Sequence, residues 1–240
     1  MSFQIIYYEE IDSTNSQAWR LIDRDLAGSD RNTVIIAKRQ TKGRGQRGNI
    51  WQSDLGGLFM SVILKPNLAA ANAHQITLWS AWGIAKALNE TGANVKLKWL
   101  NDLLIDRRKL GGILTETRIE AGKIRYAVVG IGLNWTNEVP ENAIALGELP
   151  TTLSSMDELI EVVLKGIDLG QTRCDREGML GILAEYLELL SDKNVRQTIN
   201  RRELQGKIID IRPTGELVVR WDGNSQEAIY QPQTFSVGYQ

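Results

Sequence analysis

Apolar and polar residues alternate along the first segment of the chain, residues 1–11, with Phe3 and Ile5 on the same side of the pattern. A period of two is typical of a half-buried β-strand. Residues 12–15 all have side chains that commonly cap a helix, and apolar residues at helical spacing continue to about Asp25. The chain is therefore expected to open with a strand followed by a helix.

The middle of the chain contains short apolar runs and one long amphipathic segment. The long segment, from about residue 73 to 91, has the period of a helix, and Gly92 is placed to end it. The short runs are bounded by glycine, proline and aspartate, which predicts strands. These predicted strands cover residues 33–38, 58–64, 95–99, 103–105, 112–119 and 124–133.

The last third of the chain changes from helical to alternating periodicity. Residues 152–204 have helical spacing of leucines, whereas residues 207–211, 216–221 and 227–230 alternate apolar and polar positions between Gly-containing turns. A meander of this size does not fold without packing on a larger body. We expect a large domain over residues 1–204 and a small β domain over residues 205–240.

Composition and charge narrow the class of protein. The 240 residues include 28 Lys and Arg against 29 Asp and Glu, so no global field favours nucleic acid or a membrane surface. Cys174 is the only cysteine, which excludes an internal disulfide and fits a reducing compartment. No signal peptide or membrane-spanning stretch is visible in the sequence. We expect a cytoplasmic protein without membrane or nucleic-acid partners.

A glycine- and arginine-rich segment, GRGQRG at residues 43–48, is the densest chemical signal. Its G-x-G-x-x-G spacing would suit a dinucleotide site only if a helix began there and an acidic residue followed about 20 positions later. A strand follows instead, with no such acid, so that interpretation fails. Arg44 and Arg47 can still pair with phosphate, and Trp51 is placed to stack on a base. A mobile basic surface loop is the alternative.

Two further motifs carry polar groups to predicted strand ends. The first, KWLND at residues 98–102 followed by KLGG at 109–112, offers lysines for phosphate and a carboxylate and amide for Mg²⁺. An ordinary Asn-Asp turn with solvated lysines is the alternative. The second, GIGLN at residues 130–134, suggests close approach of a ligand or of neighbouring backbone.

The candidate residues lack a nucleophile with its base. His74 is the only histidine; we expect it to precede the long helix as a surface or capping residue. A site rich in Arg, Lys and Gly indicates nucleotidyl or phosphoryl transfer, in which positioning and charge neutralisation do most of the work.

Five motifs in order resemble those of biotin protein ligases (holocarboxylase synthetases) over nearly the whole chain. They are DSTN at 12–15, Gln40 with GRGQRGNIW at 43–51, KWLND at 98–102, KLGGIL at 109–114 and GIGLN at 130–134. The resemblance implies an α/β (α+β) fold. It would have a mixed β-sheet flanked by helices, a biotin/lipoate ligase-like catalytic domain, and a small, abbreviated SH3-like domain at the C-terminus.

The resemblance also implies roles for individual residues. Lys109, Arg44 and Asp102 would be catalytic, and Asp102 would help to hold Mg²⁺. The biotin pocket would consist of Ser13, Thr14, Gln40, Gly43, Arg44, Lys109 and Gly112. ATP would contact Arg44, Arg47, Trp51, Lys98, Asn101, Asp102 and Asn134.

The implied reaction uses biotin and ATP as substrates with Mg²⁺, and passes through biotinyl-5′-adenylate. The implied partner is the biotin carboxyl carrier protein of acetyl-CoA carboxylase, whose lysine takes the biotinyl group. Many members of the family can pair as homodimers, and the sequence leaves that open. Only 11 residues precede Asp12, so we expect no helix-turn-helix and no operator binding.

Three positions and one region depart from the family pattern. Gln46 and Asn49 replace two arginines, which predicts easier escape of the adenylate, and Leu100 replaces a proline, which predicts a looser turn. The C-terminal region is shortened. Three alternatives stay open: a lipoate or octanoate ligase or transferase on the same fold, a non-catalytic nucleotide-binding module, and a weakened ligase retained for binding biotin.

Overall fold

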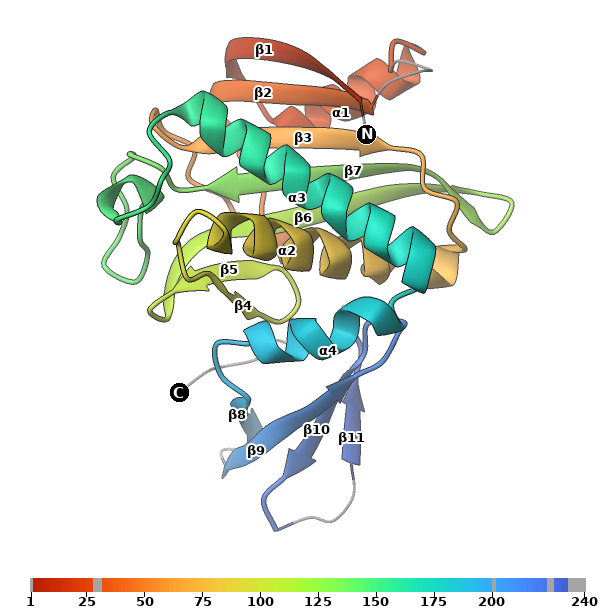
Figure 1. Ribbon diagram of the computed structural model, residues 1–240. Helices are drawn as coiled ribbons and strands as arrows, with labels where there is room; N and C mark the ends of the chain where they lie inside the picture. The colour runs from red at the N-terminus through yellow and green to blue at the C-terminus, as the bar shows by residue number, and fades with distance from the viewer. Residues whose placement is uncertain (1, 28–31, 200–201, 224–226, 233–240) are drawn as a thin grey trace.

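A seven-stranded mixed sheet forms the centre of the computed structural model, which describes residues 2–27, 32–199, 202–223 and 227–232 (Figure 1). The strand order is β1-β2-β3-β7-β6-β5-β4; β1 and β2 are parallel and the other pairs antiparallel. The strands are β1 (Phe3–Ile11), β2 (Asn32–Gln40), β3 (Leu58–Leu64), β4 (Lys96–Lys98), β5 (Asp102–Ile105), β6 (Arg108–Glu120) and β7 (Lys123–Leu133). The predicted mixed sheet is confirmed.

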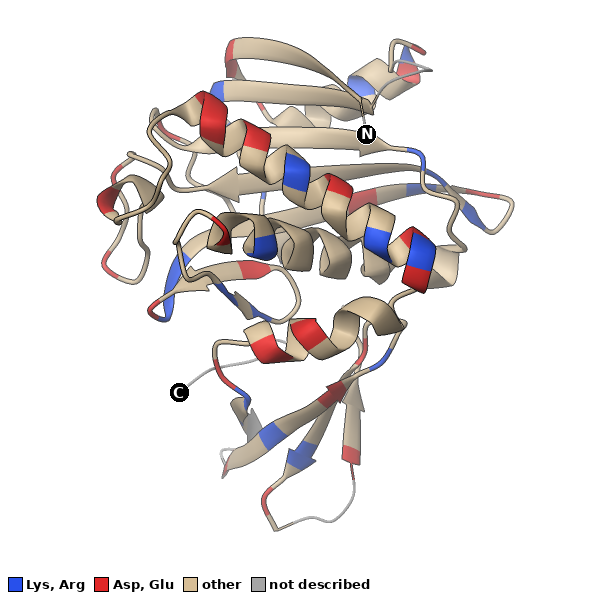
Figure 2. Cartoon of the chain, in the orientation of Figure 1, with Lys and Arg blue, Asp and Glu red and all other residues tan. Residues whose placement is uncertain are grey.

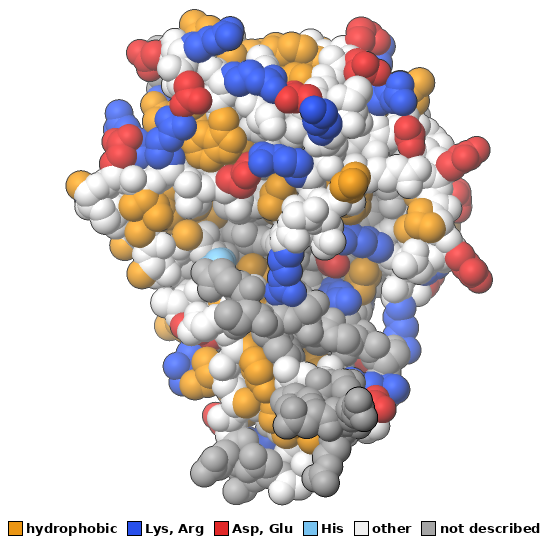
Figure 3. All heavy atoms as spheres, turned by 180° about the vertical axis from the view of Figure 1, so that it is seen from behind, with side chains coloured by type: hydrophobic (Ala, Val, Ile, Leu, Met, Phe, Trp, Pro, Cys, Tyr) orange, Lys and Arg blue, Asp and Glu red, His pale blue; other side chains and the backbone are white. Residues whose placement is uncertain are grey.

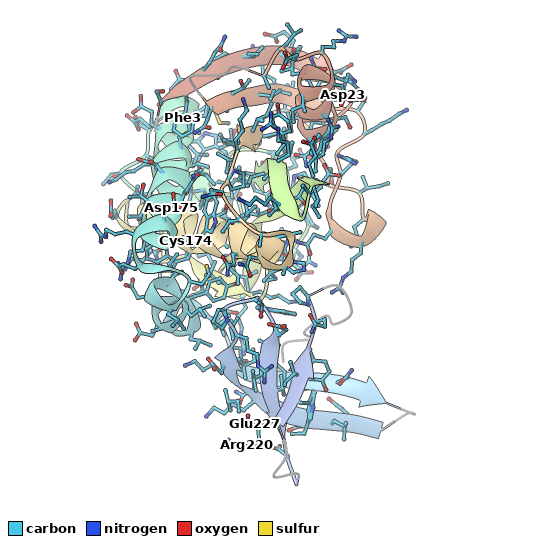
Figure 4. The ribbon with its side chains drawn as sticks, turned by 90° about the vertical axis from the view of Figure 1, so that its right-hand side faces the viewer. Phe3, Asp23, Cys174, Asp175, Arg220 and Glu227 are labelled. Atoms are coloured by element: carbon cyan, nitrogen blue, oxygen red, sulfur yellow. The ribbon has the colours of Figure 1, made fainter. Side chains whose placement is uncertain are left out.

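Helices cover both faces of this sheet. α2 (Ala73–Asn89) and α3 (Met156–Glu177) lie on one face, and α1 (Thr14–Asp23) lies on the other (Figures 1 and 4). α2 and α3 approach closely where Gly83 meets Gly166. A Cβ at Gly83 would lie 2.1 Å from the carbonyl oxygen of Gly166, so only glycine allows this approach. The predicted long helix therefore serves as the inner layer of the core, and most of its residues are buried.

A second sheet of four strands follows α4 (Leu180–Leu189) at the C-terminal end of the chain (Figure 1). Its order is β11-β10-β9-β8. Ile208 and Trp221 of this sheet belong to the same buried cluster as the core under the main sheet. The strands are β8 (Asn194–Ile199), β9 (Arg202–Ile211), β10 (Leu217–Trp221) and β11 (Glu227–Tyr230).

The prediction of helix over residues 152–204 is wrong beyond α4. Residues 194–199 form β8, which pairs with β9 in the register Val195↔Gly206. The leucine spacing ends at Leu190, and the β-branched residues after it gain ladder hydrogen bonds only through this pairing. The division of the chain at residues 204 and 205 stays a prediction. Its end, residues 233–240, lies outside the described residues.

The position of His74 also differs from the expectation. It lies within the first turn of α2 rather than before it, and a Cβ at Gly215, in the turn between β9 and β10, would lie 2.9 Å from its Cβ. Burial in this contact lowers the pKa of His74, an effect that nearby Glu216 opposes. His74 therefore lies where the small sheet meets α2, separate from the glycine-rich segment.

Charge is distributed over the surface in both signs. Acidic and basic side chains are interspersed along α3 (Figure 2). Among the helices in the described part of the chain, none has the length and apolarity needed to cross a membrane.

Candidate functional site

Glycines on two neighbouring strands form the floor of the site, on the α1 side of the sheet. The register pairs Gly112 of β6 with Gly132 of β7. A Cβ at Gly132 would lie 2.6 Å from Nε1 of Trp51, and one at Gly130 would lie 2.2 Å from Oδ1 of Asn15. Because neither glycine has a side chain, Trp51 and Asn15 lie directly against the sheet.

The first cavity, about 60 Å³, lies between the start of α1, the end of β2 and this glycine floor. Its polar wall is fixed by one amide: Gln40 Oε1 accepts from the Thr14 backbone N–H at 2.8 Å, and Gln40 Nε2 donates to Ser53 Oγ at 2.9 Å. The capping oxygen of α1 thus comes from Gln40, since the side chain of Ser13 makes no cap hydrogen bond. Sequence reasoning could not assign this cap, because Gln40 is distant in the chain.

The second cavity, about 180 Å³, lies beside the first and is richer in cations. Lys98, Lys109 and Arg47 all line it. Lys109 and Trp51 line both cavities, together with Gly45, Gln46 and Asn101. On the face of the molecule turned away in Figure 1, Lys and Arg side chains gather around the middle (Figure 3). A ligand that spans the two cavities would pass Lys109.

Four charged groups line the second cavity: Arg47, Lys98, Asp102 and Lys109. Lys109 Nζ lies 2.9 Å from Asp102 Oδ1 and 5.3 Å from the centroid of the Trp51 ring. Burial lowers the pKa of Lys98; Asp102 opposes this shift and the charge of Lys109 adds to it. Two ammonium groups facing one carboxylate leave surplus positive charge for phosphate.

The turn that carries Asn101 and Asp102 is anchored from α4. The peptide bond before Leu100 is cis, and the Leu100 carbonyl accepts a hydrogen bond from the Tyr186 hydroxyl at 2.9 Å. Leu100 and Tyr186 are both buried. Leu100 predicts a looser turn at this position. The Tyr186 hydroxyl nevertheless bonds the backbone of the turn, and no pattern in the sequence indicates this contact.

An acidic residue missed in the sequence joins the glycine-rich segment to the first cavity. Glu116 Oε2 accepts from Arg44 Nη2 at 2.6 Å and from Asn15 Nδ2 at 2.8 Å. Glu116 lies four residues after Gly112 on β6, so the period of two places both on the same face. This spacing from Gly112 is the one feature of the sequence that could have indicated that Glu116 faces the site.

A family model described as the biotin/lipoate A/B protein ligase family matches residues 7–134, more than half of the chain. This segment contains the glycine floor and all of the residues predicted for the site. The chain belongs to this family.

Relatives within the biotin/lipoate A/B protein ligase family include two bacterial proteins named bifunctional ligase/repressor BirA. The protein of Bacillus subtilis (strain 168) is 33% identical over 156 residues, 64% of this chain and 47% of that protein. The protein of Escherichia coli (strain K12) is 30% identical over 224 residues, 89% of this chain and 68% of that protein. The chain thus spans about half the length of the Bacillus relative that it matches.

A solved structure of the biotin protein ligase from Aquifex aeolicus, in complex with biotin and ATP, is similar to this chain throughout. The TM-score is 0.72 at 25% identity, with 95% of this chain and 99% of that chain covered. The similarity includes the C-terminal region, because nearly the whole of both chains aligns.

Most of the residues predicted from the family pattern lie together around the two cavities, but Gly43 and Asn134 do not line either one. A Cβ at Gly43 would lie 2.3 Å from the Trp51 carbonyl oxygen, so this glycine admits the backbone of Trp51. The Asn134 amide donates to the Lys109 carbonyl at 3.3 Å. In this structure both act on the site through a neighbouring residue.

The donor set for Mg²⁺ is small. Asn101 and Asp102 provide one amide and one carboxylate, and no group of three or more His, Cys, Asp or Glu residues suited to a metal occurs in the described part of the chain. Such a pair fits a Mg²⁺ ion that takes most of its ligands from phosphates and water.

Cys174 lies on α3, across the sheet from α1 (Figure 4). Burial raises the pKa of its thiol to about 11, so almost none of it is thiolate at neutral pH. This position and pKa argue against the octanoate transferase alternative in a form that uses Cys174 as its nucleophile.

Proposed function

We propose that the chain is an ATP-dependent biotin protein ligase that forms biotinyl-5′-adenylate and then transfers the biotinyl group to a lysine of a carrier protein. The observation that carries the proposal is Lys109 at the junction of a small polar cavity and a larger cationic one. The names of the bacterial relatives and of the Aquifex aeolicus structure support it.

In the proposed arrangement, the first cavity holds the ureido ring of biotin. Ser13, Thr14, Gln40 and the space over Gly112 form its walls, with Gly43 acting through Trp51. The Gln40 amide is held in one orientation by Thr14 and Ser53. Amide and hydroxyl groups of fixed direction match a ligand that has both donors and acceptors, and would reject one that lacks them.

The second cavity would take ATP. Trp51 would stack on adenine; Arg47, Lys98 and Asn101 would serve the phosphates; and Asn134 would act through the backbone of Lys109. The biotin carboxylate is itself the nucleophile, so its attack on the α-phosphate is opposed mainly by charge repulsion, which Arg44 and Lys109 would reduce. When bound, Mg²⁺ would neutralise phosphate charge near Asp102.

The experiment that tests the proposal is ATP–pyrophosphate exchange with the purified protein, with biotin, lipoate or octanoate as the acid. Exchange with biotin alone is the expected result. Exchange with lipoate or octanoate would keep the fold and change the substrate. ATP binding without exchange in any of the three would favour a non-catalytic module.

The transfer step assigns a role to Asp102. The carrier lysine must lose a proton before it attacks the acyl carbon, and the Asp102 carboxylate, 2.9 Å from Lys109 Nζ, is the acidic group that we propose as base. Asp102→Ala should slow transfer from preformed adenylate about 100-fold. Single-turnover transfer of radiolabelled biotin measures this step, and an unchanged rate would remove Asp102 from the role.

We further propose a biotin carboxyl carrier protein of acetyl-CoA carboxylase as the partner, and a cytoplasmic location. A relative from Paracoccus denitrificans, 32% identical over 142 residues, is named biotin–[acetyl-CoA-carboxylase] ligase. Two further expectations stay predictions: that nucleic acid is not a partner, and that the adenylate escapes more easily past Gln46 and Asn49. Whether the chain pairs as a homodimer stays open.

A further inference from the structure

The glycine-rich segment is connected to β6 by side chains that reach across a hollow. A cavity of about 540 Å³ separates much of residues 41–50 from the strand and is lined by Arg44, Leu114 and Glu116, among others. Arg44 Nη2 contacts Glu116 Oε2 across this gap at 2.6 Å, and Gln46 Nε2 contacts the Ile113 carbonyl at 3.4 Å beside the first cavity. Of these two, only the first joins opposite charges.

One oxygen of Glu116 receives donors from two parts of the fold. Besides Arg44, Oε2 accepts from Asn15 Nδ2 at 2.8 Å and from Trp19 Nε1 at 3.2 Å, both on α1. Asn15 is only 3% exposed and lines the first cavity, and its Oδ1 accepts from Ser61. Glu116 thereby ties the arginine of the segment to the wall of that cavity.

We propose that Glu116 is a positioning residue that holds Arg44 over the first cavity. A guanidinium has five N–H donors, so the bond from Nη2 to Glu116 leaves other N–H groups for an anion. An arginine that is already held loses less conformational freedom when a ligand binds. An effect of Glu116 on catalysis rests on the proposed function, because Arg44 contributes to the reaction only if a carboxylate or phosphate group binds beside it.

Trypsin cleavage after Arg44 tests the contact without any need for activity. Glu116→Gln keeps an acceptor for Asn15 and Trp19 but removes the ion pair, so cleavage should become about threefold faster. Glu120→Gln on the same strand is the matched control, because Glu120 pairs with Arg125 at 3.7 Å and lines neither site cavity. Equal cleavage of the Glu116 variant and wild type would overturn the proposal.

Exchange kinetics test the consequence. Glu116→Gln should lower kcat/KM for biotin-dependent exchange about tenfold, and should have no further effect in an Arg44→Ala background. Faster exchange, or an equal loss in both backgrounds, would contradict a positioning role. If Glu116→Gln does not fold, as judged by circular dichroism, Glu116→Asp is the second variant. Its shorter side chain draws the carboxylate away from Arg44, so cleavage should also become faster. A wild type without exchange would refute the proposed function and leave the cleavage result intact.

Discussion

At the scale of single residues, the site depends on glycines, because the lack of a Cβ lets other side chains lie against the sheet. Gly130 and Gly132 leave room on the sheet surface for Asn15 and Trp51, two side chains that line the first cavity. Gly112 faces more open space, since a Cβ there would meet its nearest atom, Asp102 Oδ1, at 3.4 Å. The glycines of the two motifs therefore have different roles.

Gly132→Ala should displace the Trp51 ring, because the new methyl group would lie 2.6 Å from Nε1. We expect ATP affinity to fall about tenfold, in line with the loss of a base-stacking contact. Isothermal titration with ATP measures this loss. Gly112→Ala, whose methyl group fits locally, is the matched control and should affect biotin more than ATP; the reverse order would contradict the assignment of the cavities.

The lowered pKa of Lys98 predicts a pH dependence of nucleotide binding. Its ordinary pKa is 10.5, and burial shifts it down, so the ammonium charge is lost at a lower pH than for an exposed lysine. ATP affinity should fall as pH rises through the lowered pKa. Lys98→Arg should keep its charge and move this decline to higher pH. Titrations between pH 7 and pH 10 give the comparison; superimposable profiles would count against a role for Lys98.

The same shift has a consequence for stability. Between the lowered pKa and 10.5, the unfolded chain binds more protons at Lys98 than the folded chain does. The contribution of Lys98 to the free energy of unfolding therefore rises with pH over that interval.

At the scale of elements, the site is held by segments that the sequence does not place near it. α4 contacts the Asn101–Asp102 turn through Tyr186, and β2 supplies the cap of α1 through Gln40. The strands β3, β6 and β7 were predicted within a few residues, because their apolar runs decide them locally. β8 was missed, because residues 194–199 become a strand only through pairing with β9.

Tyr186→Phe tests the anchor from α4. Loss of the hydroxyl leaves the buried Leu100 carbonyl without this donor, which should reduce the free energy of unfolding by about 1–3 kcal/mol. The KM for ATP should rise as well, because the Asn101–Asp102 turn shifts. Tyr230→Phe is the control: it removes a hydroxyl that bonds Trp221 in the small sheet. Urea unfolding and exchange kinetics would separate the two; equal KM values in both variants would refute the anchor.

At the scale of the whole molecule, the two sheets share one buried cluster. Ile208, Leu217 and Trp221 of the small sheet belong to the cluster that contains Trp79 and Trp82 of α2. The Gln75 side chain adds a hydrogen bond from α2 to the Pro213 carbonyl at 2.9 Å. The small sheet is thus part of the packing that supports the main sheet.

A shared cluster predicts cooperative unfolding. Differential scanning calorimetry should give one transition, with a calorimetric enthalpy equal to the van't Hoff enthalpy. Trp221→Ala should lower the midpoint of that single transition, since it opens a space in the common core. Two separate transitions would instead indicate that the C-terminal sheet unfolds as an independent domain.

The sequence by itself determined the order of the elements through β7, the glycine-rich segment, and the set of cations and amides from which the site is built. These features are local: they follow from periodicity, turn residues and the chemistry of short motifs. Tertiary structure decided the rest. It brought Glu116 to Arg44, Gln40 to Thr14 and Tyr186 to Leu100, each across at least 26 positions of sequence. Such contacts depend on which strands and helices become neighbours in the fold, and no local pattern along the chain specifies them.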